Sequence, residues 1–291
     1  MKTQFDPELL SSFYLWFENY LVKDKNKAYE TGLANTFKHV NFKDLPASQV
    51  GYQGVFRSLV ADADIDVPNT GFFVGGSFVT ADTDANGGVL TDYQNGRLIF
   101  PVASGSSLSI TANSTVKEIN VYTTSQTDEE ILMSSDFKED GAGFPYLYSK
   151  DARLDEVIYA LPACFISTTS SDNKEFAFGG EEDTRSSIKV MVITDGQYML
   201  DSTLSCFRDS VRTTFSHIPY ESMPYGNKFS LKNYPYSYVG TEAALTSPTK
   251  SFIEGVKVTK VTVDKIREFL NKNLFIGFID FDISTLRFPR L

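Results

Sequence analysis

The clearest alternation of hydrophobic and polar positions lies between Gly87 and Val102, in the sequence GGVLTDYQNGRLIFPV. Asn95-Gly96 is a residue pair that strongly favours the two positive-φ positions of a type I′ turn. Residues that alternate between two faces lead into this pair and out of it, as expected for paired strands. The pattern therefore predicts a β-hairpin whose two-residue turn is Asn95-Gly96.

A helical spacing marks the N-terminal region. Asp6 can cap a helix, and Pro7 suits its first turn. Apolar residues then recur at intervals of three and four, which is the period of one helix face. We predict a helix over residues 6–24, whose broad aromatic face belongs to the core or, alternatively, packs on a neighbouring subunit. The residues of this face are Leu9, Phe13, Trp16, Phe17, Tyr20 and Leu21.

Short strands fill the rest of the first half. Residues 72–79 predict one strand that Gly75-Gly76 bends or bulges. Residues 116–124 alternate cleanly between apolar and polar positions and predict another strand. Residues 138–145 have the composition of a linker or long turn. We therefore place a domain boundary near residue 150.

The second half predicts two strands followed by a helix. Residues 157–168 and 188–194 are apolar enough for buried strands, and the polar stretch 170–187 between them predicts a loop. Asp195 can cap the helix that follows. Apolar residues of that helix share one face: Leu200, Leu204, Phe207, Val211 and Phe215.

The end of the chain adds two further strands. Residues 218–238 predict a long aromatic loop, and loops of this length are usually functional or form interfaces. Residues 252–263 and 274–283 predict strands, and residues 265–271 predict a short helix.

These elements predict a β-rich α+β fold. The first domain, residues 1–150, would hold the N-terminal helix and a β-rich part with hairpins. The second, residues 151–291, would hold a mixed sheet with a flanking amphipathic helix.

Composition and charge exclude some classes of function. The 291 residues include 42% hydrophobic and 14% aromatic residues, which suits a packed core and large interfaces. The net charge is −10, whereas proteins that grip nucleic acid through its phosphates are basic. An acidic surface could still line a passage through which DNA slides.

Cysteine use and hydropathy indicate where the protein is made. Cys164 and Cys206 each lie in an apolar run and are expected to be buried thiols rather than a disulfide framework, which fits synthesis in a reducing compartment. Met1 is not followed by an apolar signal region, and no run reaches the length of a membrane helix. We therefore expect a protein made in the cytoplasm, with no membrane partner.

Candidate catalytic chemistry is sparse. The two histidines, His39 and His217, lie in no recognisable hydrolase, zinc or phosphate-binding motif. Asp280 and Asp282 share one strand face and could hold a metal or act as paired carboxylates, but a structural or lumen-facing role is the simpler reading. The acidic stretches 62–66 and 181–183 are expected to be solvated loops. We expect no enzymatic activity, and assign no catalytic, cofactor-binding or metal-binding residue.

One stretch resembles the opening of a calcium loop. Asp82, Asp84 and Asn86 provide oxygen ligands at alternate residues, and Gly87 follows where such a loop turns sharply. The position of the closing glutamate is occupied by Tyr93, and no second helix is expected. A simple turn is favoured, with a bound cation as the alternative.

Several phrases of the sequence resemble virion structural proteins of tailed bacteriophages. They are SFYLWFENYL followed by KAY, TDYQNGRLIF, KEINVYTTSQTDEEIL, FAFGG and LFIGFIDFDIS, and they are spread along most of the chain. The β-β-α order from Val157 to Phe215 is also similar to that of tail terminator proteins. The resemblance implies a subunit of a ring, six-fold or twelve-fold, in the neck that joins head and tail.

The partners implied by this resemblance are other copies in the ring, neighbouring neck and tail proteins and, passively, the translocating DNA. The implied location is the virion. Two alternatives stay open from the sequence. The chain could be a tail or baseplate component, or it could be a carbohydrate-binding β-module whose tyrosines between Tyr220 and Tyr238 stack on sugars.

Overall fold

The structure is a computed structural model of the whole chain, and its described residues form two compact units built from interleaved segments. One unit comprises Met1–Leu21, Ile119–Tyr220 and Leu245–Leu291, and the other comprises Val22–Glu118 and Glu221–Ala244. The sequence had instead suggested a single boundary near residue 150. The described residues are 5–23, 26–42, 45–80, 89–101, 107–124, 132, 135–139, 145–148, 159–176, 180–224, 236–261 and 274–288.

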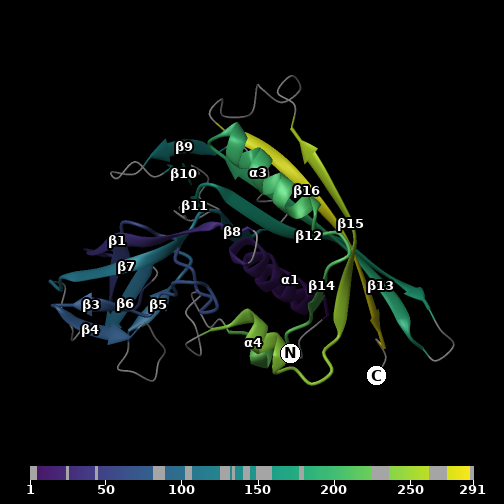
Figure 1. Cartoon of the computed structure of the whole chain (residues 1–291), viewed down its shortest axis with the longest axis horizontal. Helices are drawn as coiled ribbons and strands as arrows, with labels where there is room; N and C mark the ends of the chain where they lie inside the picture. Colours follow the sequence, from purple (N-terminus) through teal and green to yellow (C-terminus); the bar gives the residue numbers. More distant parts are fainter. Residues whose placement is uncertain are drawn as a thin grey trace. The chain divides into compact units, whose positions relative to one another are not determined.

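The unit that contains Val22–Glu118 is built on a seven-stranded antiparallel sheet with the order β4-β3-β7-β1-β2-β6-β5 (Figure 1). One face of this sheet carries the buried residues Phe37, Tyr52, Phe72, Leu98, Phe100, Ile110 and Ala112. The strands are β1 (Tyr29–Val40), β2 (Gln49–Gly54), β3 (Gly71–Val74), β4 (Ser77–Thr80), β5 (Leu90–Asp92), β6 (Arg97–Pro101) and β7 (Ile110–Lys117).

The predicted hairpin is present as β5 and β6, but its predicted turn is wrong. Residues 93–96 connect the strands, and Gly96 has a φ of +60° whereas Asn95 is not among the residues with positive φ. The Asp92 carboxylate explains the difference, because it accepts hydrogen bonds from the backbone N–H of Asn95 at 3.1 Å and from its Nδ2 at 2.8 Å. Asn95 therefore closes an Asx-type loop instead of a two-residue turn.

A two-residue turn occurs at Gly75-Gly76, where the sequence had suggested a bend within one strand. Both glycines have positive φ, +57° and +86°, and Val74 pairs with Ser77 across them. Residues 72–79 are therefore a hairpin, β3–β4. Two successive positive-φ residues favour this turn over a bulge because only the turn reverses the chain.

The other unit is built on a six-stranded mixed sheet with the order β14-β15-β16-β13-β12-β8 (Figure 1). The β8–β12 pair is parallel, and the other neighbours are antiparallel. The strands are β8 (Asn120–Thr123), β12 (Ala163–Glu175), β13 (Glu182–Thr194), β14 (Thr214–Ser216), β15 (Lys250–Lys260) and β16 (Phe275–Arg287). The expected mixed sheet, and the β-rich α+β class, are confirmed.

The predicted loop over residues 170–187 is wrong. β12 and β13 stay paired from Ser170↔Ser187 to Glu175↔Glu182, after a register shift between Thr168 and Ser170. The composition of this stretch is typical of loops, but β16 pairs along the whole of β13 and fixes its backbone in the sheet. Sheet pairing thus overrides local propensity here.

Two helices cover one face of this sheet, α1 (Phe5–Val22) and α3 (Gln197–Arg208) (Figure 1). The ring of Phe13 meets those of Phe215 and Phe281 at centroid distances of 5.7 and 5.1 Å. The core alternative for the aromatic face of α1 is confirmed, since Trp16 is also buried. The predicted second helix ends earlier than expected, because Phe215 lies in β14.

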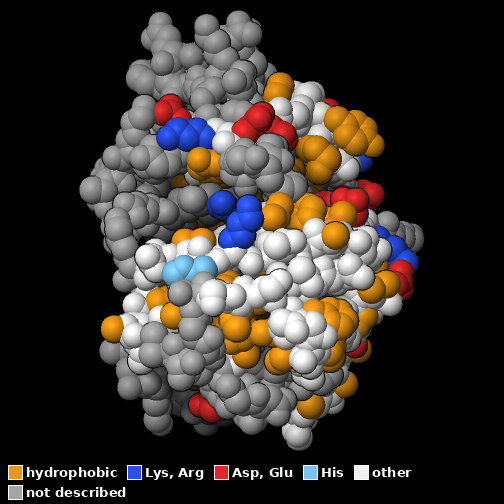
Figure 2. Space-filling view, turned by 90° about the vertical axis from the view of Figure 1, so that its left-hand side faces the viewer, with side chains coloured by type: hydrophobic (Ala, Val, Ile, Leu, Met, Phe, Trp, Pro, Cys, Tyr) orange, Lys and Arg blue, Asp and Glu red, His pale blue; other side chains and the backbone are white. Residues whose placement is uncertain are grey.

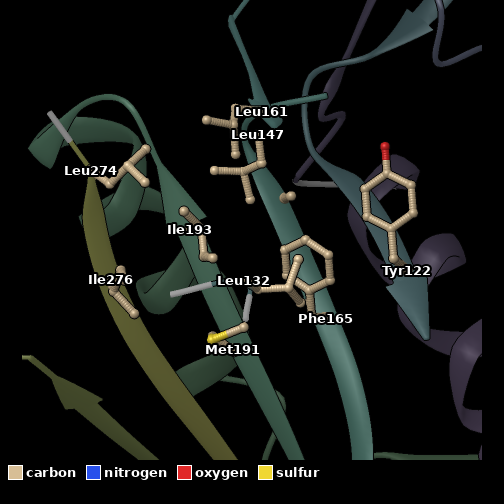
Figure 3. Close-up of a cluster of buried hydrophobic side chains, with 10 residues drawn as sticks. Tyr122, Leu132, Leu147, Leu161, Phe165, Met191, Ile193, Leu274 and Ile276 are labelled. Atoms are coloured by element: carbon tan, nitrogen blue, oxygen red, sulfur yellow. The ribbon is translucent and has the colours of Figure 1, made fainter. Parts of the chain in front are cut away.

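The opposite face packs against a small three-stranded sheet, β9 (Asp136–Glu139), β10 (Pro145–Tyr148) and β11 (Tyr159–Ala160). Figure 3 shows the cluster that joins the two sheets, in which Leu147 and Leu161 lie near Ile193. Parts of the predicted linker 138–145 are thus strand, and the predicted helix 265–271 lies outside the described residues. The short elements are η4 (Tyr220–Ser222) and α4 (Tyr238–Ala243).

Candidate interaction surfaces

Asp280 and Asp282 lie on one face of β16, as the alternation predicted. Asp280 stands opposite Lys189 of β13 and Lys257 of β15, and Asp282 stands opposite Ser187. The positive charges of these two lysines offset the negative charge of the Asp280 carboxylate, which makes the position unfavourable for a bound cation. Among the described residues, no three His, Cys, Asp or Glu side chains come together as a metal site. The pair is therefore best explained as part of a mixed-charge sheet surface.

The same face carries exposed apolar residues near the C-terminal end of β16. Phe252 stands opposite Ser284 in the register and is 48% exposed, and Leu286, two residues further on, is 39% exposed. Phe288 directly follows β16 and is 49% exposed. We call Phe252, Leu286 and Phe288 the apolar end of the six-stranded sheet. Residues of this size rarely gather on a monomer surface without a function.

Polar groups border the apolar end and hold its strands in place. The Asp183 carboxylate accepts a hydrogen bond from the Ser284 hydroxyl at 2.6 Å and pairs with Arg185 at 2.9 Å. The hydroxyl bond and, second, the guanidinium keep the pKa of Asp183 below its usual value. The expected solvated loop 181–183 is thus partly wrong, because Glu182 and Asp183 lie in β13.

On the opposite face, four small polar residues form a row across the sheet. Ser251, Thr285, Thr184 and Asn173 are successive partners on β15, β16, β13 and β12. Ser251 and Thr285 hydroxyls lie 2.5 Å apart, and the Thr184 hydroxyl donates to Asn173 Oδ1 at 2.7 Å. Arg287 Nε donates to the Thr184 hydroxyl at 2.6 Å. We call these four residues the polar row.

His217 ends the polar row. Its Nε2 lies 2.7 Å from the Ser251 hydroxyl, which is the contact distance of a catalytic Ser–His pair. Both residues are buried, however, and the Phe5 ring stacks on the imidazole at 5.2 Å. Burial and, second, the charge of Arg287 lower the pKa of His217 to about 4, so the ring is neutral near pH 7. The pair therefore satisfies buried polar atoms and offers a substrate no access to Ser251.

The acidic stretch 62–66, expected to be solvated, is buried at Asp62 and exposed at Asp64 and Asp66. Asp62 is buried, and burial raises its pKa above the usual value. Asp64 accepts hydrogen bonds from Lys23 Nζ at 3.2 Å and from the hydroxyl of Ser237, the N-cap residue of α4. The stretch thus fixes the segment around α4 to the seven-stranded unit, and the expectation of a solvated loop is wrong for Asp62 but holds for the exposed Asp64 and Asp66. No local pattern in the sequence indicates a partner so distant along the chain.

The remaining candidates fall on several parts of the molecule. The cysteines are free, Cys164 buried as expected and Cys206 half-buried. His39 lies beside Tyr52, with ring centroids 5.7 Å apart. Asp82, Asp84, Asn86 and Gly87, the stretch that resembles a calcium loop, lie outside the described residues.

The second exposed apolar surface belongs to the β3–β4 hairpin. Phe73 and Phe78 are direct partners, their rings meet edge to face at 5.5 Å, and they are 46% and 54% exposed. Figure 2 shows one side of the molecule, on which much of the described surface carries no charged side chain. We call Phe73 and Phe78 the aromatic edge.

The fold is that of a β-rich α+β protein, and its described residues include exposed apolar side chains on both large sheets, the apolar end and the aromatic edge. Comparison with models of known protein families and with curated proteins found no match to this chain. Among the helices in the described part of the chain, none has the length and apolar character needed to cross a membrane.

Proposed function

We propose that the chain is a structural component of a tailed-phage virion, a ring-forming neck or head–tail connector protein, or tail terminator, that joins head and tail around the DNA path. The resemblance of its sequence phrases to virion structural proteins supports the location. The observation that carries an assembly role is the apolar end of the six-stranded sheet. An assembly subunit needs apolar surface that a partner covers, and Phe252, Leu286 and Phe288 provide it.

The form of this surface suits a permanent contact. Phe252 and Leu286 project from paired strands of a packed sheet, so little conformational entropy is lost when a partner covers them. Charged residues such as Arg185 and Asp183 surround them and would supply a polar rim. The net charge of −10 suits a ring whose inner wall repels the DNA backbone and lets it pass.

The test has two parts. Purified particles of the phage that encodes the chain should contain it in a fixed copy number, and mass photometry of the purified chain, alone and with heads or tails, should detect a ring-sized species. Its absence from particles would overturn the virion proposal. Phe252→Lys and Leu286→Lys should abolish the ring or its binding to heads and tails. Tyr198→Lys, on the exposed face of α3, is the control and should not.

A tail or baseplate component remains the alternative within virions, and the same particles distinguish it by the position of the chain along the tail. The carbohydrate-binding alternative receives less support. Tyr220 is exposed, but Tyr236 and Tyr238 are buried and cannot stack on a sugar, while Tyr225 and Tyr234 lie outside the described residues.

A further inference from the structure

β4 is one edge of the seven-stranded sheet, and among the described strands none pairs with its outer side, toward which some of its backbone groups point. The backbone N–H of Gly75 donates to the carbonyl of Ser109 at 2.9 Å. The backbone N–H and C=O groups of odd-numbered residues in the β3 segment therefore point toward β7, and those of even-numbered residues point toward β4. Ser77 and Val79 of β4 are the partners of the even-numbered residues, so their backbone groups point toward β3. Because hydrogen-bonding direction alternates along a strand, the N–H and C=O of Phe78 point away from the sheet.

This edge lacks the usual protection against pairing. Natural edge strands carry charges or prolines, or are covered. Residues 71–80, GFFVGGSFVT, contain neither a charged residue nor a proline. The other described edge strands differ: β9 carries Asp136, Lys138 and Glu139, β11 has only two residues, and β5, β8 and β14 are mostly buried. Among the described strands, β4 is thus the exposed and uncharged edge.

We propose that β4 pairs with β4 of a second copy of this chain, antiparallel and around a two-fold axis at Phe78. With the axis perpendicular to the sheet, Phe78 stands opposite the partner's Phe78, and the two residues exchange both backbone hydrogen bonds. Opposite residues in a sheet project to the same face. Phe73, Phe78 and their two copies then form one row of four aromatic rings.

Charge favours a second copy over another edge of the same protein. Two chains with a net charge of −10 repel each other, and the repulsion is smallest where the contacting segments carry no charge. Pairing β4 with the charged strand β9 would place unpaired charges beside Phe78. An isologous contact also pairs both β4 edges at once and leaves neither open to a third copy. Because salt screens the remaining repulsion, added salt should increase the dimer fraction.

Analytical ultracentrifugation from low to high micromolar concentration tests the pairing. We expect the wild-type chain to form a dimer of about 65 kDa, twice the 32.5 kDa of one chain. If the Phe78→Lys variant itself forms a larger species, the wild-type species should have twice the mass of that species. Phe78→Lys should halve the wild-type mass, because it places two lysines face to face on the axis. Val40→Lys is the matched control, since it adds the same charge to an exposed position of β1 in the same sheet. A wild-type monomer at every concentration, or equal effects of the two variants, would overturn the proposal.

Phe78→Cys provides a second measurement that fixes the register. Hydrogen-bonded partners in an antiparallel pair have Cα atoms about 5.5 Å apart, within the range that a disulfide spans. Mild oxidation should therefore cross-link this variant into a covalent dimer, whereas Val40→Cys should stay monomeric on a non-reducing gel. Absence of the Phe78→Cys cross-link would refute pairing centred on this residue. Neither result depends on whether the chain occurs in virions, so the two proposals can fail separately.

Discussion

Truncation of Phe17 to alanine tests whether the aromatic face of α1 holds that helix to the six-stranded sheet. Phe17 is fully buried. Its ring stacks on Phe207 of α3 at 3.9 Å between centroids and with 9° between the planes. It also meets Phe13 at 5.8 Å and Phe281 of β16 at 6.3 Å. The side chain thus joins two helices and the sheet at one point.

The expected loss of stability follows from this environment. A buried Phe→Ala substitution costs about 3–5 kcal/mol, from lost transfer energy and from the cavity left behind. We expect the upper half of that range, because the surrounding rings belong to three elements and cannot all move into the cavity. About 0.5–1.5 kcal/mol of the loss belongs to the ring contact with Phe207. Phe17→Leu keeps most of the apolar volume and should recover more than half of the loss.

Urea unfolding followed by tryptophan fluorescence measures this effect. Trp16 is the only tryptophan of the chain and is buried next to Phe17, so its emission reports on the packing of α1. Tyr198→Ala, at a site 82% exposed, is the control and should change stability by less than about 0.5 kcal/mol. If Phe17→Ala lowered stability by less than about 1 kcal/mol with an unchanged m-value, the packing argument would be refuted.

Three further changes test the polar groups. Because burial lowers the pKa of His217 from 6.5 to about 4, the folded state binds fewer protons than the unfolded chain between these values. Stability should therefore fall by roughly 3 kcal/mol as the pH drops through that window, and His217→Gln should remove this dependence in urea unfolding; equal slopes would contradict it. Asp64→Ala should cost about 1–2 kcal/mol and expose the segment at Ser237 to protease, unlike a surface control. Burial raises the pKa of Cys164 and, to about 11, that of Cys206, so both thiols should resist alkylation at mildly alkaline pH until urea is added; rapid native labelling would contradict it.

Local patterns predicted the elements whose structure depends on nearby residues. The helix predicted at residues 6–24 is observed as α1, which begins at Phe5, so that Asp6 lies inside it and does not cap it, and ends at Val22. The helix predicted after Asp195 is observed as α3, but the predicted cap is wrong, because Gly196 is its N-cap residue. The hairpin near Asn95 was found, but its turn was not, because the competing Asp92 side chain lies only three residues away. Turn residues are shared by several turn types, so the pair alone does not decide between them.

Features that depend on long-range pairing could not be read from the sequence. The polar row joins residues from four strands, and its members become neighbours only once the register of β12, β13, β15 and β16 is set. Asn173 and Thr184 lie in a stretch with the composition of a loop, so the sequence predicted a loop there instead of paired strands. Asp62 is buried through contacts with the segment after Glu221, more than a hundred residues away. Composition says nothing about such partners.

The two exposed apolar surfaces would bind in different ways, and that difference makes them separable. At β4 the contact is made mainly by the backbone, so Phe78→Lys acts by placing like charges across the axis, and the dimer should strengthen with salt. At the apolar end of the six-stranded sheet, Phe252 lies between its partners Thr214 and Ser284, so a partner protein would contact the side chains rather than the backbone. Leu286 of β16 is likewise paired, with Asp183 of β13. Salt should affect that contact less, and truncation to alanine should weaken it as much as a charge does. A chain whose assembly responds to lysine at Phe78 but not at Phe252 would assemble through its edge alone, and the role of the six-stranded sheet in a ring would then have to be abandoned.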